Sequence, residues 1–398
     1  MEVKNNYKII IVGGGTAGIC VAARLKNIDS TLDIAIIEPS KKHYYQPLWT
    51  LVGGGVFKKE ETERNEVDYI PDGVTWIQES VDKFLPEDNK ILIQNGKELT
   101  YEYLVVATGM ELYWDKIKGL KENIGKNGVC SNYSYNTVDS TWNVVEHFKG
   151  GNAIFTQPST PIKCGGAPQK ALYLTEDYFR TKSKVRDKTK MIFFSGLAGI
   201  FGVDKYKKAL EKVVKRKEID ARFRYDLIEI IGEKKEAVFK NLDTQEEVKM
   251  NYDMLHVVPP MGTHSFIKNS TLVDSAGFVE VDKFNMQHVR YANIFSLGDC
   301  SSLPTARTGA AIRKQAPVLV DKLMSLIENR SSSLEYDGYS SCPLVTGYGS
   351  LILAEFNYLS QPTESFPFDQ SKERFSMYML KAYALPQMYW NGMLRGKM

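Results

Sequence analysis

Two of the five cysteines lie in loops where a thiol can be reactive. Cys164 follows Lys163 and stands before Ala167–Phe179, a segment whose sequence predicts a helix. A neighbouring cation and a helix N-terminus both stabilise a thiolate, which predicts a nucleophile at neutral pH. Cys342 lies in a turn that Pro343 stiffens. Loops rich in glycine and proline often carry reactive groups, so both are candidate redox residues, although a cysteine taken alone is more often a small buried apolar residue.

The other three cysteines have weaker indications of chemistry. Cys20 lies on the first predicted helix and is expected in the core, and Cys300 is expected to pack. Cys130 stays unassigned. We find no CxxC pair or Cys/His cluster with metal-site spacing, so no metal is predicted. Five cysteines spread over a long chain expected in the cytosol do not form a disulfide framework.

The start of the chain predicts a strand, a glycine-rich turn, a helix and a second strand. The first strand is Tyr7–Val12, and the second, Asp33–Ile37, ends at an acid. In this pattern the first glycine allows a tight turn, the second admits a pyrophosphate, and the third lets helix and strand pack closely. The acid can accept hydrogen bonds from both hydroxyls of an adenosine ribose. The expected cofactor contacts are Gly13, Gly15, Thr16, Ala17, Gly18 and Glu38.

Two further segments favour FAD over NAD in this site. Tyr103–Gly109 reads YLVVATG and resembles the ATG motif of the two-dinucleotide-binding-domain flavoproteins. Tyr291–Asp299 is a predicted strand ending in Gly-Asp, and in that superfamily the aspartate holds a ribityl hydroxyl of the flavin. A helix predicted over Thr305–Leu323 would point its positive end at the flavin pyrimidine. These segments add Ala107, Thr108, Gly109, Gly298 and Asp299 to the expected contacts.

The middle of the chain predicts a second Rossmann-like domain with a damaged nucleotide motif. Lys190–Ser195 is the expected first strand, and Gly196–Gly202 follows it as GxxGxxG instead of GxGxxG. Leu197 and Ala198 replace the glycine that would admit a pyrophosphate, so tight NADH binding is not expected. The electron donor is therefore predicted not to be a nicotinamide.

The last segment, Phe366–Met398, is rich in aromatic residues and methionine. A helix is predicted over Phe375–Leu385, Pro386 is expected to break it, and a second stretch runs to Leu394. Each stretch is too short to cross a bilayer but fits one that lies in the interface. The alternative is a pair of helices packed on the chain's own core.

These motifs together resemble the sulfide:quinone oxidoreductases, closest to the type that includes the mitochondrial enzyme. The resemblance covers nearly the whole length. It rests on VGGGTAG, HYYQPLWTLVGGG, PIKCGGAPQK, AGIFGV, MLHVVPPM, LGDC, SCPLVTGY, LILAEF and FPFDQSKERFSMY.

The resemblance implies a redox pair, Cys164 and Cys342, on opposite sides of a sulfide pocket beside non-covalently bound FAD. The pair would be joined at rest, perhaps through an extra sulfur. Hydrosulfide would attack one sulfur and leave a persulfide, and the freed thiolate would pass electrons to the flavin. Either cysteine can carry the persulfide, with Cys164 favoured as the one next to the flavin. Sulfite, a small thiol or a second sulfide would take the sulfur. A membrane quinone, either ubiquinone or menaquinone, would take the electrons.

The same resemblance assigns residues at the quinone end. Phe366, Phe368 and Tyr378 are the candidates for contacting the quinone ring, and Lys381 for bonding a flavin or quinone carbonyl. The loop that His43 opens, which holds Gln46, is expected beside the isoalloxazine. His256 is expected to be a satisfied core histidine.

The predicted architecture is α/β, with two Rossmann-like dinucleotide-binding domains, the second inserted in the first, and a C-terminal membrane-associating helical segment. The FAD domain is expected over 1–111 and 281–360, the second domain over 112–280 and the C-terminal segment over 361–398. Competing interpretations are a type II NADH:quinone oxidoreductase and a non-catalytic flavin-binding signalling protein.

The expected location is the cytoplasmic face of a membrane, as a peripheral, monotopic protein. The polar start of the chain shows no presequence, which predicts a chain kept in the cytosol or one given without its presequence. A net charge of +3 is too small to indicate nucleic acid as a partner. The sequence leaves the oligomeric state open, a homodimer included.

Overall fold

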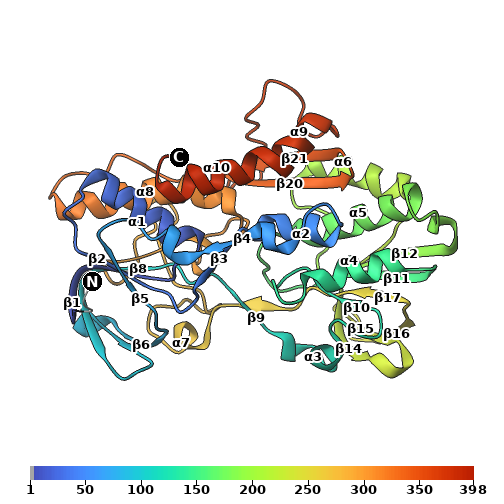
Figure 1. The fold of residues 1–398 in the computed structure, drawn as a ribbon, viewed down its shortest axis with the longest axis horizontal. Helices are drawn as coiled ribbons and strands as arrows, with labels where there is room; N and C mark the ends of the chain where they lie inside the picture. Colours follow the sequence, from blue (N-terminus) through green and yellow to red (C-terminus); the bar gives the residue numbers. More distant parts are fainter. Residues whose placement is uncertain (1–3) are drawn as a thin grey trace.

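The computed structural model describes residues 4–398, so the first three residues of the polar N-terminal segment lie outside the described part. Two α/β units lie side by side along the longest axis of the molecule (Figure 1). The fold class predicted from the sequence, two Rossmann-like units with a C-terminal helical segment, is confirmed.

The first unit is built on a seven-stranded sheet with mainly parallel strands. Its central strand β1 is nearly continuous apolar sequence because helices or loops cover both faces of a parallel sheet. Helices α1 (Thr16–Ile28) and α8 (Gly309–Ile327) pack against each other over this sheet. The strand order is β5 (Val74–Ile77), β2 (Ile34–Ile37), β1 (Asn6–Val12), β8 (Glu98–Val106), β7 (Lys90–Ile93) and β6 (Val81–Leu85), with β19 (Ile294–Ser296) also paired to β8.

Strand register brings the cofactor motifs to one edge of this sheet. Val12 pairs with Ile37 on one side and with Val106 on the other, so three strands end at the same level. Ser296 of β19 pairs with Val106 as well. The glycine turn, the acid, the ATG motif and the Gly-Asp turn therefore all follow strands that end together, which is where open α/β sheets bind their ligands.

The second unit contains a five-stranded parallel sheet, and one sequence prediction about it is wrong. Lys190–Ser195 was expected to be its first strand, but two earlier strands precede it, and the central one is Gly151–Gln157. That strand was missed because its ends are polar and it begins at glycines with positive φ. The order is β10 (Val129–Cys130), β17 (Met254–His256), β11 (Gly151–Gln157), β12 (Thr189–Ser195) and β13 (Asp220–Phe223).

This strand order places the site that a dinucleotide would use after β11, and not after β12 as the sequence had indicated. The strand order reverses between β17 and β11, and the loop after β11, residues 158–166, enters helix α5 (Ala167–Thr181). That loop carries Cys164 and no glycine motif. The degenerate motif Gly196–Gly202 follows β12, one strand away, and leads to α6 (Asp204–Arg216). The topological switch point of the second sheet is therefore occupied by the cysteine loop.

A hairpin of two antiparallel strands joins the cores of the two units. Its strands β20 (Ser340–Gly347) and β21 (Ser350–Phe356) pair with Cys342 opposite Ala354. Side chains alternate along a strand. Cys342 and Leu344 accordingly lie in the core of the second unit, next to α5, while Val345 lies in the core of the first.

The remaining elements connect or cover the two sheets. A short pairing of β9 (Glu111–Leu112) with β18 (Met261–Gly262) lies at the junction between the units. The others are β3 (Lys42–Tyr44), α2 (Trp49–Gly53), β4 (Glu63–Asn65), α3 (Leu120–Asn123), α4 (Val138–His147), β14 (Tyr225–Ile231), β15 (Glu236–Asn241), β16 (Glu247–Asn251) and α7 (Ser265–Lys268).

The C-terminal segment differs from its prediction at the proline. Helix α9 (Phe375–Met379) continues through a π-helical turn, Leu380–Ala384, directly into α10 (Leu385–Asn391). Pro386 does not break a helix because it stands in the first turn of α10, where its missing N–H is tolerated. The π-helical turn before it absorbs the change in hydrogen bonding.

Only part of this segment presents apolar side chains to the outside. Phe375, Met379 and Tyr383 are exposed, whereas Tyr389 and Trp390 are buried in the core of the first unit, together with Met393 and Leu394. The second stretch, to Leu394, thus packs on the chain's own core, as the alternative interpretation has it, and membrane contact of the first stretch stays a prediction.

The glycines of the first turn allow a test of the fold. A Cβ on Gly18 would lie 1.9 Å from the carbonyl oxygen of Gly13, whereas one on Gly202 would meet no atom within 4 Å. We expect Gly18→Ala to destabilise the FAD-free protein by about 1–3 kcal/mol, since α1 must move away from β1. Thermal denaturation measures this, with Gly202→Ala as the control; equal melting temperatures for both variants would contradict the packing described.

Candidate active site

The glycine turn of the first unit fits a pyrophosphate. Gly13 has φ +104°, and a Cβ there would lie 2.5 Å from the carbonyl oxygen of Ala107, so the turn needs glycine. A Cβ on Gly15 would meet nothing within 4 Å, so its backbone faces open space at the start of α1. A helix N-terminus with free backbone N–H groups and open space before it suits an anion.

Two carboxylates flank this turn. Glu38 accepts hydrogen bonds from the backbone N–H groups of Gly14, at 2.8 Å, and Ser40, at 2.7 Å. Burial raises the pKa of Glu38 in spite of these bonds, and the nearby Glu66 raises it further. Glu66 was not anticipated. Its side chain is buried, and among the described residues nothing donates a hydrogen bond to its Oε1.

The segment from Gly298 to Arg307, called here the flavin-end segment because the flavin is expected beside it, follows β19, whose partner β8 leads into the ATG motif. Asp299 lies in a short turn after β19, and Arg307 donates from Nε to its carbonyl oxygen at 3.0 Å. Burial raises the pKa of the Asp299 carboxyl, while Arg307 and Lys163 oppose that shift. The hydroxyl of Thr108 is buried beside the Cys300 thiol and has no oxygen or nitrogen partner in the described chain.

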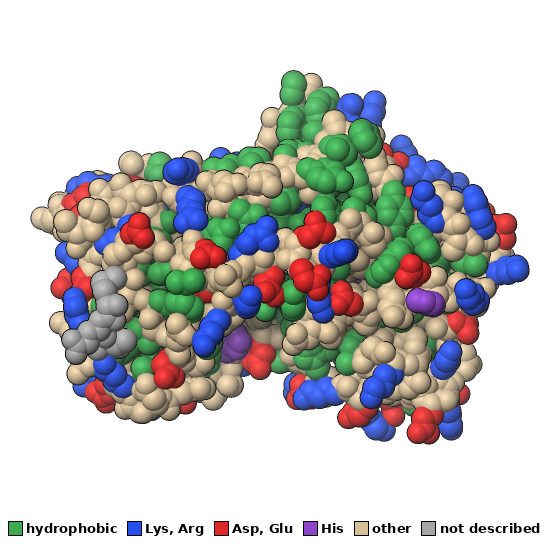
Figure 2. All heavy atoms as spheres, in the orientation of Figure 1, with side chains coloured by type: hydrophobic (Ala, Val, Ile, Leu, Met, Phe, Trp, Pro, Cys, Tyr) green, Lys and Arg blue, Asp and Glu red, His purple; other side chains and the backbone are tan. Residues whose placement is uncertain are grey.

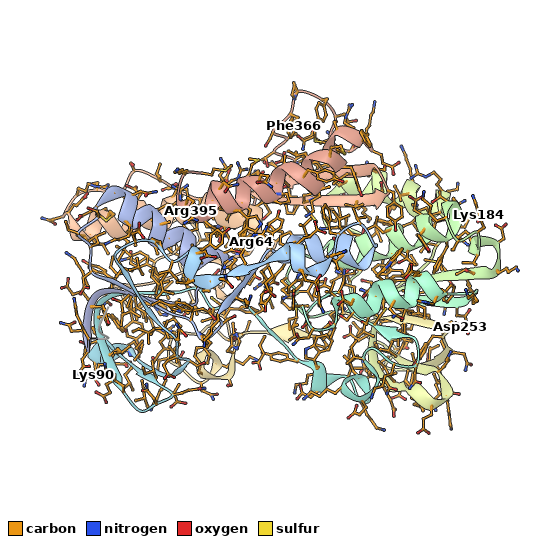
Figure 3. The ribbon with its side chains drawn as sticks, viewed as in Figure 1. Arg64, Lys90, Lys184, Asp253, Phe366 and Arg395 are labelled. Atoms are coloured by element: carbon orange, nitrogen blue, oxygen red, sulfur yellow. The ribbon has the colours of Figure 1, made fainter. Side chains whose placement is uncertain are left out.

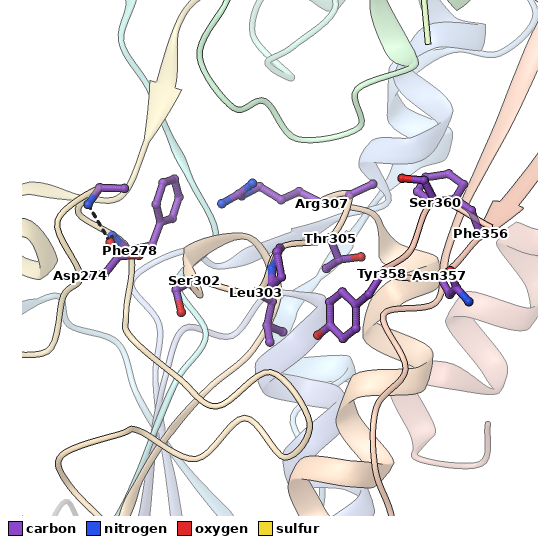
Figure 4. A pocket seen from close by; sticks show the side chains of 13 residues that line it. Asp274, Phe278, Ser302, Leu303, Thr305, Arg307, Phe356, Asn357, Tyr358 and Ser360 are labelled. Atoms are coloured by element: carbon purple, nitrogen blue, oxygen red, sulfur yellow. Dashed lines mark hydrogen bonds between the residues drawn. The ribbon is translucent and has the colours of Figure 1, made fainter. Parts of the chain in front are cut away.

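The helix after this turn starts later than predicted. Helix α8 begins at Gly309, not at Thr305, and the Thr308 side chain accepts a hydrogen bond from Ala311 N at 3.3 Å as an N-cap. The residues before the cap are extended and form one wall of an open cavity of about 380 Å³ beside Arg307 (Figure 4). The Arg307 guanidinium stacks 4.3 Å above the ring of Phe278 in this cavity.

The structure brings Cys164 and Cys342 together, although the prediction that Cys342 lies in a turn is wrong, because the residue pairs with Ala354 inside strand β20. Cys164 has a left-handed backbone, with φ 55°, and its N–H donates to the carbonyl oxygen of Arg307 at 2.7 Å. Its thiol interacts directly with that of Cys342, and both are free thiols in the structure. The fit is close, because a Cβ on Gly166 would lie 2.4 Å from the Cys342 sulfur. The Cys164 loop is therefore held against both the Cys342 hairpin and the flavin-end segment.

The two thiols differ in acidity. Lys170, a buried residue of α5, donates from Nζ to the Cys164 sulfur at 3.1 Å. Contact with Cys342, and then the charge of Lys170, hold the pKa of Cys164 well below its usual range against the effect of burial. Contact with Cys164 and burial raise the pKa of Cys342 well above its usual range. These shifts and the Lys170 contact favour the thiolate on Cys164 and the proton on Cys342.

Two further lysines lie near the two thiols and bond neighbouring residues of one loop, Gln46 and Pro47. Lys381, in the π-helical turn, donates to the carbonyl oxygen of Pro47 at 2.8 Å, and burial, together with the charge of Lys170, lowers its pKa to about 7. Lys163 donates to Gln46 Oε1 at 2.7 Å, and burial lowers its pKa to about 8. Both lysines interact with the charge on Cys164, so Gln46 and Lys381 lie at the same site as the thiols.

Comparison with known proteins shows the family to which the chain belongs. The family described as pyridine nucleotide-disulphide oxidoreductase matches residues 7–142. The mitochondrial sulfide:quinone oxidoreductase of Dictyostelium discoideum is 53% identical over 399 residues, covering 100% of this chain and 88% of that protein. Its counterpart from Mus musculus is 47% identical over 394 residues, covering 99% and 87%. The chain belongs to the sulfide:quinone oxidoreductase family. Flavin is thereby indicated as the cofactor.

A solved structure shows the same fold. The sulfide:quinone oxidoreductase of Aquifex aeolicus superposes with a TM-score of 0.83 at 19% identity, covering 98% of this chain and 92% of that one. The fold of the family is thus kept at an identity at which most side chains differ.

The three residues expected at the quinone end all lie at the first core. Phe366 and Phe368 stack on each other with centroids 5.3 Å apart, and Arg374 lies 4.2 Å above the Phe368 ring. They belong to the projecting loop at the top of the molecule, where Phe366 is labelled (Figure 3). Tyr378 is buried in the first core, against which Phe366 and Phe368 also pack, and contact with a quinone stays a prediction for all three.

The remaining cysteines and His256 are core residues. His256 is buried, its Nε2 bonds Asn132 Oδ1 at 2.8 Å, and burial lowers its pKa to about 3. Burial raises the pKa of Cys130 to about 12 and also raises those of Cys20 and Cys300. None of these three thiols has the environment of a nucleophile at neutral pH.

Sequence reasoning missed Lys170, Glu66 and Tyr389. Lys170 had a recognisable signal, since it is a lysine in the first two turns of a helix that otherwise begins with small and apolar residues after the cysteine. Glu66 and Tyr389 had none, because their roles depend on a contact between distant parts of the chain.

The lysine beside Cys164 gives a prediction about acidity. Replacing Lys170 with methionine removes the charge that stabilises the thiolate, so Cys164 should ionise at higher pH. We expect alkylation of the reduced protein by iodoacetamide at pH 7 to slow by at least about tenfold at Cys164. Peptide mass spectrometry measures the rate, with exposed Lys182→Met as the control. An unchanged alkylation profile would show that Lys170 does not set this acidity.

Proposed function

We propose that this chain oxidises sulfide by two electrons through the pair Cys164 and Cys342 and FAD, and passes the electrons to a membrane quinone. The observation that carries the proposal is the direct contact of the two thiols beside the flavin-end segment, with a buried ammonium on one of them. A structural pair of buried cysteines would not need the charge of Lys170. Family membership adds the substrate, since the relatives are named for sulfide and quinone.

The unequal acidity of the thiols decides the direction of attack. With the pair oxidised, hydrosulfide attacks one sulfur, a new S–S bond forms, and the Cys164–Cys342 bond breaks. The thiol with the lower pKa is the better leaving group. Cys164 therefore leaves as the thiolate that Lys170 stabilises, and Cys342 keeps the added sulfur as a persulfide.

The cofactor is FAD held without a covalent bond. Gly15 and the N-terminus of α1 would hold its pyrophosphate, Glu38 its adenosine ribose, and Asp299 with Thr108 its flavin end. When bound, FAD would accept two electrons from the thiol site and pass them on to the quinone. Lys381, with a pKa lowered to about 7, can hold or release a proton there near neutral pH.

A small nucleophile must remove the outer sulfur from the persulfide. The cavity beside Arg307 adjoins the Cys164 loop, because the Arg307 carbonyl accepts the Cys164 N–H. We place the entry of the acceptor here, and the guanidinium favours an anion such as sulfite or a thiol that carries a carboxylate.

The architecture disfavours the NADH-dependent alternative. The switch point of the second sheet is occupied by the cysteine loop, and the degenerate glycine motif follows the neighbouring strand. Anaerobic bleaching of the flavin absorbance discriminates the three interpretations. We expect sulfide to bleach it and NADH not to. Bleaching by NADH alone would favour a type II NADH:quinone oxidoreductase, and bleaching by neither would favour a protein without turnover.

Replacement of either cysteine tests the redox pair. We expect Cys164→Ser and Cys342→Ser each to reduce quinone-dependent sulfide oxidation by at least about a thousandfold, because no disulfide can then form. The control is Cys130→Ala, which removes a third thiol that lies in the core. This variant should retain activity. FAD content, measured on the same samples, shows that the site is intact. Full activity in either serine variant would refute the role of that cysteine.

We further propose that the protein attaches to the membrane surface through its projecting C-terminal part. No helix within residues 4–398 is long and apolar enough to cross a membrane. Phe375 is 66% exposed and lies with Met379 and Tyr383 on one stretch, called here the apolar face. Hydrophobic side chains gather around this part of the surface, with lysines and arginines near them (Figure 2). Such a surface suits one leaflet that contains anionic lipid.

Charged substitutions test the apolar face. We expect Phe375→Asp combined with Met379→Asp to weaken binding to anionic vesicles by about a hundredfold, since burial of two such side chains contributes about 3 kcal/mol or more. Vesicle co-sedimentation measures binding. Leu359→Asp is the control, because Leu359 is 74% exposed but lies outside the apolar face. Equal loss in both variants would mean that attachment is not localised to this face.

A further inference from the structure

A chain of buried hydrogen bonds runs along the glycine turn and is not used by the sulfur chemistry. Glu66 Oε2 lies 3.0 Å from His43 Nδ1, and His43 Nε2 lies 2.6 Å from the Tyr389 hydroxyl. The Tyr389 hydroxyl lies 2.7 Å from Thr16 Oγ1, on the first residue of α1. We call these four residues the latch. His43, Glu66 and Tyr389 are buried.

The two ends of the latch both point to the dinucleotide site. Thr16 begins the helix whose N-terminus faces the pyrophosphate position. At the other end, Glu66 is 1% exposed, and its Oε1 has no hydrogen-bond partner in the described chain. This oxygen lies against the glycine turn, 2.5 Å from the position that a Cβ on Gly14 would take. A buried carboxylate oxygen without a donor is costly. It lies beside Glu38, and an adenosine ribose offers two hydroxyl donors, one for each carboxylate.

The latch also fixes the end of the chain. Tyr389 and Trp390 pack with Tyr45 and Tyr69, and Arg64 lies 5.2 Å from the centroid of the Trp390 ring. Arg64 and Arg395 lie where the C-terminal helix meets the first unit (Figure 3).

The last residues dock on the helix of the dinucleotide site itself. Asn27 of α1 donates to the carbonyl oxygen of Arg395 at 2.9 Å, and Arg24 of α1 bonds the carbonyl oxygen of Met398. Residues from Met393 to Met398 thus lie on the helix that begins at the pyrophosphate position.

We propose that the latch couples FAD binding to docking of the C-terminal segment. Glu66 accepts a ribose hydroxyl beside Glu38, and Tyr389, which His43 orients, fixes the Thr16 hydroxyl at the start of α1. Coupling between two binding events is reciprocal, so FAD stabilises the docked C-terminal segment as much as the docked segment stabilises FAD. The same segment carries Lys381 and the apolar face, so FAD binding would also stabilise the quinone side.

The first experiment measures FAD affinity of the FAD-free protein by quenching of flavin fluorescence. We expect Tyr389→Phe and Glu66→Gln each to weaken binding by about tenfold, the effect of losing one buried hydrogen bond. Tyr103→Phe is the matched control, since its hydroxyl makes no hydrogen bond in the described chain, and it should stay within about twofold. Affinities like wild type in both latch variants would overturn the proposal.

The second experiment follows docking directly, by trypsin cleavage after Lys372 and Arg374 with and without saturating FAD. We expect FAD to protect these sites in the wild type and to protect them much less in Tyr389→Phe. Cleavage of the wild type at the same rate with and without FAD would overturn the proposal, even if a variant failed to fold. Neither experiment contains sulfide or quinone, so failure here is distinguishable from failure of the proposed activity.

Discussion

The contact between the Cys164 and Cys342 thiols, with the Lys170 ammonium beside them, is the interaction on which the rest of the structure depends. It forces a loop of the second sheet, a hairpin shared by two cores and the flavin-end segment to meet at one place. A buried cation without an anion would be costly, and so would a buried thiolate without a cation. Each therefore stabilises the charged form of the other, and burial makes their interaction strong.

The second sheet shows how this contact became possible in a dinucleotide-binding architecture. The switch point where a nucleotide would bind holds a loop with a left-handed Cys164, and α5 begins directly after it. The fold thus keeps the helix N-terminus that normally faces a phosphate, next to a thiolate instead. Cys342 reaches the same point because side chains alternate along β20.

The sequence predicted the elements with local signals and failed where the signal was not local. The first βαβ unit was recognisable because its glycines, its apolar strands and Glu38 lie within one short segment. The strand Gly151–Gln157 was missed because it has polar ends, and this shifted the predicted order of the second sheet. The helix through Pro386 was misjudged because a π-helical turn absorbs the proline, which no residue pattern announces. Lys170, Glu66 and Tyr389 act through contacts between remote segments, so their roles follow from the fold and not from spacing.

The most direct test of the account is mass spectrometry of the resting enzyme, alkylated without reductant and digested with trypsin. We expect one crosslinked species that joins the Cys164 and Cys342 peptides, either directly or through one added sulfur. After one equivalent of sulfide without oxygen or quinone, the link should open and the added sulfur should appear on Cys342. Quantitative alkylation of both cysteines in the resting enzyme, or a persulfide found only on another cysteine, would contradict it.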